Sequence, residues 1–110
     1  MAGFVKGDVV VVPFPFSDLS QAKRRPCVVI TRLHGDDVIL CQITSQATKD
    51  SYSIPLQDAD FETGKLNQPS NVRPNRVFTA DGGLILYRVG HLKQTKVAET
   101  VQRLVELIRA

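Results

Sequence analysis

Hydrophobic residues in this chain are grouped in short runs, rich in β-branched side chains and bounded by Gly, Pro, Asn and Asp, a pattern typical of β-strands. The first run starts at Gly7 and passes into a Pro-Phe-Pro-Phe alternation, so we expect this strand to leave the sheet where the prolines begin. Further strand candidates occupy residues 25–46, 52–58, 71–81 and 82–92. The pattern predicts a mainly β chain with roughly five to six strands.

Only the last segment, residues 95–110, changes from the period of a strand to that of a helix. We expect Thr95 to be its N-cap, and its apolar residues share one face: Val97, Val101, Leu104, Val105 and Ile108. Short strands followed by one amphipathic helix favour a small, strongly bent sheet or barrel, here a single domain over residues 1–110. Residues 58–70 form the longest irregular stretch, and loops of that length are often functional.

The strongest local signal is a β-hairpin around Gly35-Asp36, a dipeptide that supplies the positive φ of a two-residue turn. Such a turn fixes the register of the two strands and places Arg25 opposite Gln46. Because side chains alternate between faces, Thr44 shares the face of Arg25. The two residues are then diagonal neighbours, about 7–8 Å apart at the backbone.

The same register places Cys27 opposite Thr44 and Cys41 opposite Ile30, so the two thiols point to opposite faces of the hairpin. Nothing else indicates a secreted disulfide framework, and we expect reduced thiols in the core. The two histidines, His34 and His91, have no metal-ligand spacing and are interpreted as surface or turn residues. We therefore expect no metal site and no cofactor.

Composition limits the class of protein. Hydrophobic residues make up 43% of the 110 residues and charged residues 23%, which is typical of a folded globular chain. The longest apolar run, Val9 to Val12, is far shorter than the roughly 20 residues of a membrane span, and the N-terminus lacks the pattern of a signal peptide. We expect a cytoplasmic protein with no membrane contact. The net charge of +3 is a mild bias toward polyanionic partners.

Candidate chemistry lies where three successive cations, Lys23, Arg24 and Arg25, enter an apolar strand. An arginine fork matches phosphate oxygens bidentately, and the Thr44 hydroxyl and the Gln46 amide would add hydrogen bonds on the same face. Spacing alone leaves an alternative open, namely a solvated cationic strand end beside an ordinary threonine.

Three segments, "GDVVVVPFPFSDLSQAKRRPCVVI", "ILCQITSQ" and "FTADGGLILYRVGHL", resemble the MazF/PemK family of toxin endoribonucleases. The most specific elements are the Gly-Asp opening, Arg25-Pro26 and the Thr-x-Gln of Thr44 to Gln46. The resemblance implies an SH3-like barrel of the MazF/PemK/CcdB type with a C-terminal helix, assembled as a homodimer. It also implies cleavage of single-stranded RNA at a preferred sequence without metal, by attack of the RNA's own 2′-hydroxyl, leaving 2′,3′-cyclic phosphate and 5′-hydroxyl ends.

The family's catalytic arginine and threonine fall on Arg25 and Thr44. For an RNA substrate we further expect Lys23 and Arg24 to follow the RNA backbone, Ser45 and Gln46 to contact the RNA beside Thr44, and Phe16 to offer a stacking surface. Some members carry an arginine where this chain has Phe78, and we expect Arg73 or Arg76 to supply that charge instead.

The family also implies a partner, a small acidic antitoxin laid over the basic site of the toxin. Two alternatives remain open from the sequence. One is a barrel that binds RNA without cutting it, because no general base stands out among the residues. The other is a gyrase-directed toxin, because a related fold is used in that way; this alternative rests on analogy of fold.

Overall fold

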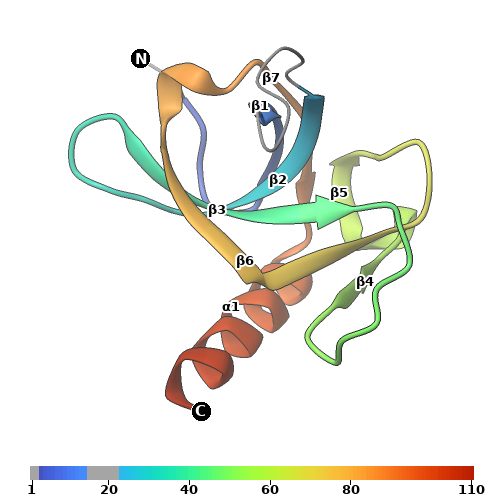
Figure 1. Ribbon diagram of the computed structural model, residues 1–110. Helices are drawn as coiled ribbons and strands as arrows, with labels where there is room; N and C mark the ends of the chain where they lie inside the picture. Colours follow the sequence, from blue (N-terminus) through green and yellow to red (C-terminus); the bar gives the residue numbers. More distant parts are fainter. Residues whose placement is uncertain (1–2, 15–22) are drawn as a thin grey trace.

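The computed structural model describes residues 3–14 and 23–110 (Figure 1). These residues form one curled sheet of seven strands in the order β4-β6-β3-β2-β1-β7-β5, with antiparallel neighbours throughout. The strands are β1 Asp8–Phe14, β2 Lys23–Arg32, β3 Asp37–Thr44, β4 Ile54–Leu56, β5 Phe61–Gly64, β6 Ser70–Asp81 and β7 Tyr87–Leu92. The helix α1, Gln94–Arg109, packs against β6, and two 3-10 helices span Asp58–Asp60 and Gly82–Leu84. The predicted class, a small strongly curled β fold with a C-terminal helix, is confirmed, with more strands than predicted.

The curl of the sheet depends on a bend in its longest strand, β6 (Figure 1). Cys41 of β3 pairs with Val77, but the next residue, Gln42, pairs with Arg73, so residues 74–76 are extra on β6. Pro74 suits this bulge because it has no N–H to donate to a ladder. The bend lets β6 pair with β3 along its whole length and with β4 at one end.

Apolar side chains are buried on both faces of the sheet, which explains the unbroken valines of β1. One cluster, on the face that α1 covers, contains Val9, Val28, Ile30, Cys41, Ile43, Ile54, Leu56, Phe61, Val72, Leu92 and Leu104. The other contains Val10, Val12, Cys27, Val29, Val38, Leu40 and Ile85. Successive residues of β1 and β2 thus alternate between two apolar layers. No helix within residues 3–14 and 23–110 is long and apolar enough to cross a membrane.

The predicted hairpin register was wrong by two residues. The Leu33 N–H donates to the Asp37 carbonyl at 2.9 Å, so the turn has one residue more than predicted. A bulge between Val29 and Thr31 adds a second offset, and Cys27 pairs with Gln42 where Thr44 was expected. Beyond the bulge the total offset is two, an even number, so the residues from Cys27 to Val29 face the side that was predicted relative to β3, whereas Thr31 and Arg32, nearer the turn, are offset by one residue.

Other boundaries also differ from those predicted. The first strand continues through Pro13, which pairs with Arg24 on one side only, because β7 pairs with β1 no further than Val11. A proline at such a position removes no ladder bond. The stretch 58–70 is not irregular throughout, since it contains a 3-10 helix and β5.

The helix begins at Gln94, and its predicted N-cap was wrong by two residues. Lys93 is the N-cap, without a side-chain hydrogen bond, and its carbonyl accepts the first helical N–H groups. Thr100 and Leu104 are buried beneath the sheet, whereas Ile108 is 71% exposed and lies off the buried face. The amphipathic character of the helix is therefore confirmed, with a shorter apolar stripe.

Both cysteines are free and buried, in different apolar clusters, as predicted. Burial raises the pKa of the Cys27 thiol to about 12, with a smaller contribution from Cys41. Burial also raises the pKa of Cys41 to about 12. Both thiols are therefore protonated and inaccessible at neutral pH.

These shifted pKa values predict a loss of stability in base. In the unfolded chain the thiols ionise near pH 9.0, whereas in the folded chain they stay protonated to about pH 12. The stabilising effect is complete below pH 9.0 and is lost as the pH rises toward 12, by about 1 kcal/mol per thiol at pH 10. Urea unfolding at pH 8 and pH 10 under reducing conditions checks this. The double variant Cys27→Ala, Cys41→Ala should lose less stability between the two pH values than the unmodified chain. An equal loss would show that the two thiols do not cause the loss of stability in base.

Candidate nucleic-acid interface

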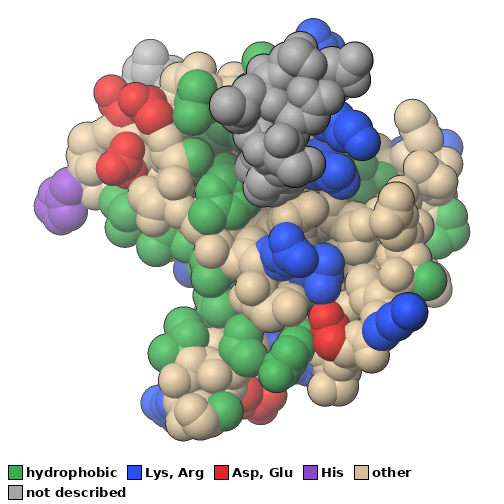
Figure 2. Space-filling view, in the orientation of Figure 1, with side chains coloured by type: hydrophobic (Ala, Val, Ile, Leu, Met, Phe, Trp, Pro, Cys, Tyr) green, Lys and Arg blue, Asp and Glu red, His purple; other side chains and the backbone are tan. Residues whose placement is uncertain are grey.

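A pocket of about 300 Å³ lies where β2 begins and β3 ends. One wall is made by residues 24–26 of β2 and 43–46 at the end of β3. The other wall is made by residues 66–68, just before β6, and by Ser70, the first residue of β6. On the face drawn in Figure 2, Lys and Arg side chains gather over this part of the sheet, while most carboxylates lie nearer the rim. The pocket combines cations with hydroxyl and amide groups.

Arg25 and Thr44 meet in this pocket because β2 and β3 are adjacent strands. The β2–β3 pairing ends at Cys27 with Gln42, and Arg25 and Thr44 each lie two residues beyond that last pair. Both residues are half-buried and line the pocket. The sequence predicted the two on one face as neighbours, and both line the same pocket.

The Thr44 hydroxyl has a defined local role. Its Oγ1 accepts a hydrogen bond from the Gln46 backbone N–H at 3.1 Å, which turns the chain sharply after β3. A hydroxyl both accepts and donates, so its hydrogen remains available for an acceptor in the pocket. The turn also places Ser45 and Gln46 on the pocket wall.

Several of the predicted site residues come together and others do not. Arg24 lines the pocket with the residues already described, and Lys23 is exposed at the start of β2. Arg73 and Arg76 are not among the pocket's lining residues: Arg76 is exposed on the bulge of β6, and Arg73 pairs with Asp50. Phe16 lies outside the residues that the structure describes.

Sequence reasoning missed the second wall. Leu66, Asn67, Gln68 and Ser70 approach Arg25 only because β5 and β6 fold back on the sheet. The length of the stretch 58–70 was a signal for function, but no motif singled out these residues. Phe78 is half-buried against the second apolar cluster.

The Gly7-Asp8 pair, one of the sequence elements shared with the family, has a structural role in this chain. Asp8 is fully buried, and its carboxylate accepts hydrogen bonds from the Val5 N–H at 2.9 Å and pairs with His91 Nδ1 at 2.8 Å. Arg88 approaches the same carboxylate at 3.6 Å. His91 was interpreted as a surface or turn residue, but it is a half-buried partner of Asp8 that ties β7 to β1.

Another hollow of about 390 Å³ lies at the far end of the β2–β3 hairpin. Its charged lining is mostly acidic, with Asp36, Asp37 and Asp81 against Arg32. Such a lining disfavours a polyanion. Within the described residues, no three His, Cys, Asp or Glu side chains gather as metal ligands.

Residues 5–108 match the sequence profile of a family described as the PemK-like, MazF-like toxin of type II toxin-antitoxin systems. The chain belongs to this toxin family. No curated protein sequence matches it at a significant level.

Solved structures of this family share the fold. MazF from Deinococcus radiodurans superposes with a TM-score of 0.76 at 18% identity, with 100% of both chains covered. The Mycobacterium tuberculosis toxin MazF-mt6 gives a TM-score of 0.69 at 22% identity, with 93% of this chain and 96% of that chain covered. An endoribonuclease solved in complex with its cognate antitoxin from a mycobacterial species gives 0.74 at 13% identity, with 96% and 95% covered. The curled sheet with its C-terminal helix is thus a MazF-like fold.

Proposed function

We propose that this toxin-family chain is an endoribonuclease that cuts single-stranded RNA at a preferred sequence without a metal ion. The observation that carries the proposal is the placement of Arg25 and Thr44, from adjacent strands, in the lining of a single pocket. A guanidinium and a hydroxyl in this arrangement suit a phosphate that gains negative charge during reaction.

The proposed reaction is an internal transfer at phosphorus. The 2′-oxygen of the RNA loses its proton and bonds to the adjacent phosphorus, the bond from phosphorus to the 5′-oxygen breaks, and that oxygen gains a proton. The products are a 2′,3′-cyclic phosphate and a 5′-hydroxyl. Arg25 stabilises the charge on the phosphorane oxygens, since an arginine remains protonated throughout. Thr44 donates a hydrogen bond to the same phosphate and orients it.

The neighbouring groups would hold the RNA strand. Lys23 and Arg24 lead into the pocket along β2 and suit contacts with successive phosphates, which would make binding depend on salt concentration. Ser45 and Gln46, on the turn after Thr44, can form hydrogen bonds with exposed base edges. Arg76, exposed on the bulge of β6, is retained as a candidate contact for the RNA outside the pocket.

The same basic pocket would receive an antitoxin. Related toxins from mycobacterial species and from Deinococcus radiodurans have been solved with antitoxin partners. We expect an acidic segment of a cognate antitoxin to cover the cations of β2 in the cytoplasm, where the RNA is also found. We further expect a homodimer, and a sedimentation mass of 12.2 kDa at micromolar concentration would contradict it.

A second candidate function is RNA binding without cleavage. It is favoured by one observation: in the described lining of the pocket, no His, Asp or Glu is available as a general base. No feature of the described residues favours the gyrase-directed alternative.

One experiment separates the two candidates. The purified chain is incubated with mixed single-stranded RNA in EDTA, and the ends of the products are mapped. We expect discrete cuts that leave 2′,3′-cyclic phosphate and 5′-hydroxyl ends. Intact RNA that remains tightly bound would favour RNA binding without cleavage and would contradict the proposed nuclease activity.

A further inference from the structure

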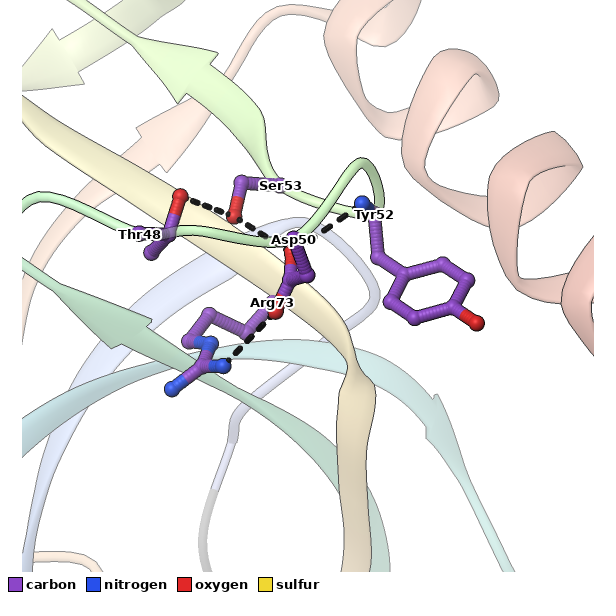
Figure 3. Close-up of polar contacts among 5 residues, drawn as sticks. All are labelled: Thr48, Asp50, Tyr52, Ser53 and Arg73. Atoms are coloured by element: carbon purple, nitrogen blue, oxygen red, sulfur yellow. Dashed lines mark hydrogen bonds and ion pairs between the residues drawn. The ribbon is translucent and has the colours of Figure 1, made fainter.

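The segment after Thr44, residues 45–53, is held by one carboxylate, that of Asp50 (Figure 3). Its Oδ1 accepts hydrogen bonds from the Tyr52 backbone N–H at 3.1 Å and from the Ser53 hydroxyl at 3.2 Å. Its Oδ2 accepts a hydrogen bond from Arg73 Nη2 at 2.9 Å. The Ser53 hydroxyl lies 2.6 Å from that of Thr48, so both sides of the segment are joined.

Arg73 is well placed to act as an anchor. It lies at the start of the β6 bulge and pairs across the sheet with Gln42, two residues before Thr44. Only 20% of its side chain is exposed. The contact with Asp50 therefore connects the segment to the part of the sheet that carries Thr44. Residues 45 and 46, on the pocket wall, lie between two fixed points: the Thr44 hydroxyl bond to Gln46 and the carboxylate of Asp50.

The Asp50 carboxylate is ionised at neutral pH. Partial burial alone would raise its pKa, but the hydrogen bonds from Arg73, Tyr52 and Ser53, with the positive charge of Arg73, hold the pKa of Asp50 below its ordinary value of 3.8. A lowered pKa means that the contact stabilises the fold above pH 3.8 and is lost as the pH falls through the folded pKa. The anchor is thus intact at neutral pH.

We propose that Asp50 and Arg73 are positioning residues, which hold residues 45–53 so that Ser45 and Gln46 stay against the bound RNA. The inference rests on the proposed nuclease function and deepens it. It also changes the role expected of Arg73, which acts on RNA through Asp50 and does not contact a phosphate itself. The charge of Arg73 is compensated by a carboxylate at 2.9 Å, which makes it a poor phosphate ligand.

The two roles of Arg73 predict opposite effects of removing its partner. If Arg73 positions the segment, Asp50→Ala and Arg73→Ala remove the same contact, and each should raise KM about tenfold while kcat changes less than about threefold. The double variant should be no worse than either single variant, because both disrupt one unit. If Arg73 binds phosphate directly, Asp50→Ala releases a cation, and RNA should bind more tightly.

The test measures KM and kcat for RNA cleavage, with hydrogen exchange of residues 45–53, in the two single variants and the double variant. Lys49→Ala is the matched control, since Lys49 is an exposed cation of the same segment. Asp50→Asn keeps the acceptor for Tyr52 and Ser53 but loses the charge, and should give a smaller rise in KM. Faster exchange with higher KM in both single variants supports the proposal. Tighter RNA binding by Asp50→Ala, or additive losses in the double variant, would overturn it.

Failure of the proposed function would give a different result. If the unmodified chain does not cut RNA, the nuclease fails, while hydrogen exchange still shows whether Asp50 anchors the segment. If the unmodified chain cuts RNA and both single variants keep its KM and its exchange rates, the positioning role fails and the nuclease stands.

Discussion

Arg25→Ala is expected to lower the rate of RNA cleavage by about a thousandfold without unfolding the protein. Removing one preorganised donor from a site of developing negative charge costs about 10²–10³ in kcat, and an arginine supplies two donors with a full charge. The Arg25 side chain is half-buried in the pocket. Among the described lining residues, Arg24 is the other cation, so the variant leaves the pocket with one positive charge in place of two. Single-turnover cleavage of RNA in EDTA measures the effect.

Matched variants separate the charge from the shape of the group. Arg32→Ala removes a cation from the far end of the same strand, outside the pocket, and should change the rate less than about twofold. Arg25→Lys keeps the charge but loses the planar fork, and an intermediate rate is expected. Thr44→Val keeps the shape of the side chain and removes its donor, for a loss of about a hundredfold. Unaltered cleavage by Arg25→Ala would show that the catalytic assignment is wrong.

Gly64→Ala should produce the largest loss of stability, about 3 kcal/mol or more. Gly64 has a φ of +71°, and a Cβ there would clash with the Val89 carbonyl oxygen. That atom belongs to the backbone of β7, so β5 must move away from its partner strand. Residues 66–68 of the pocket wall follow Gly64 closely, and RNA affinity should fall together with stability.

Gly35→Ala provides the control for this prediction. Gly35 has a similar φ of +75°, but nothing lies within 4 Å of the Cβ position. Its substitution should cost only the backbone strain, about 1–2 kcal/mol. Urea unfolding of both variants measures the difference. Equal losses of stability would mean that the close approach of β5 to β7 is not required.

The hairpin shows what sequence can and cannot specify. Alternation assigned the faces of Arg25, Thr44 and the two cysteines, and the structure retains those faces. The register was wrong because a bulge inside a run of β-branched residues leaves no mark in the pattern, and one more residue joined the turn. Because the two offsets add up to two residues, the faces of the residues beyond the bulge are unchanged.

Long-range features were missed for a different reason. The segment that forms β5 is short and mostly polar, and it becomes a strand only by pairing with β7. The contact between Asp50 and Arg73 joins residues 23 positions apart, with no periodicity to connect them. Arg73 could be recognised from sequence as a cation on a strand, but its partner depends on the bend of β6. Such contacts arise from the tertiary fold and not from local propensity.

The central claim is that the RNA's own 2′-hydroxyl is the nucleophile at a phosphate held by Arg25 and Thr44. Two short RNAs carrying a mapped cleavage site test it most directly, one unmodified and one with a single 2′-deoxynucleotide on the 5′ side of the scissile phosphate. In EDTA, the unmodified RNA should be cut to a cyclic phosphate, and the deoxy RNA should bind equally well and stay intact. Cleavage of the deoxy RNA at the same bond would contradict the account.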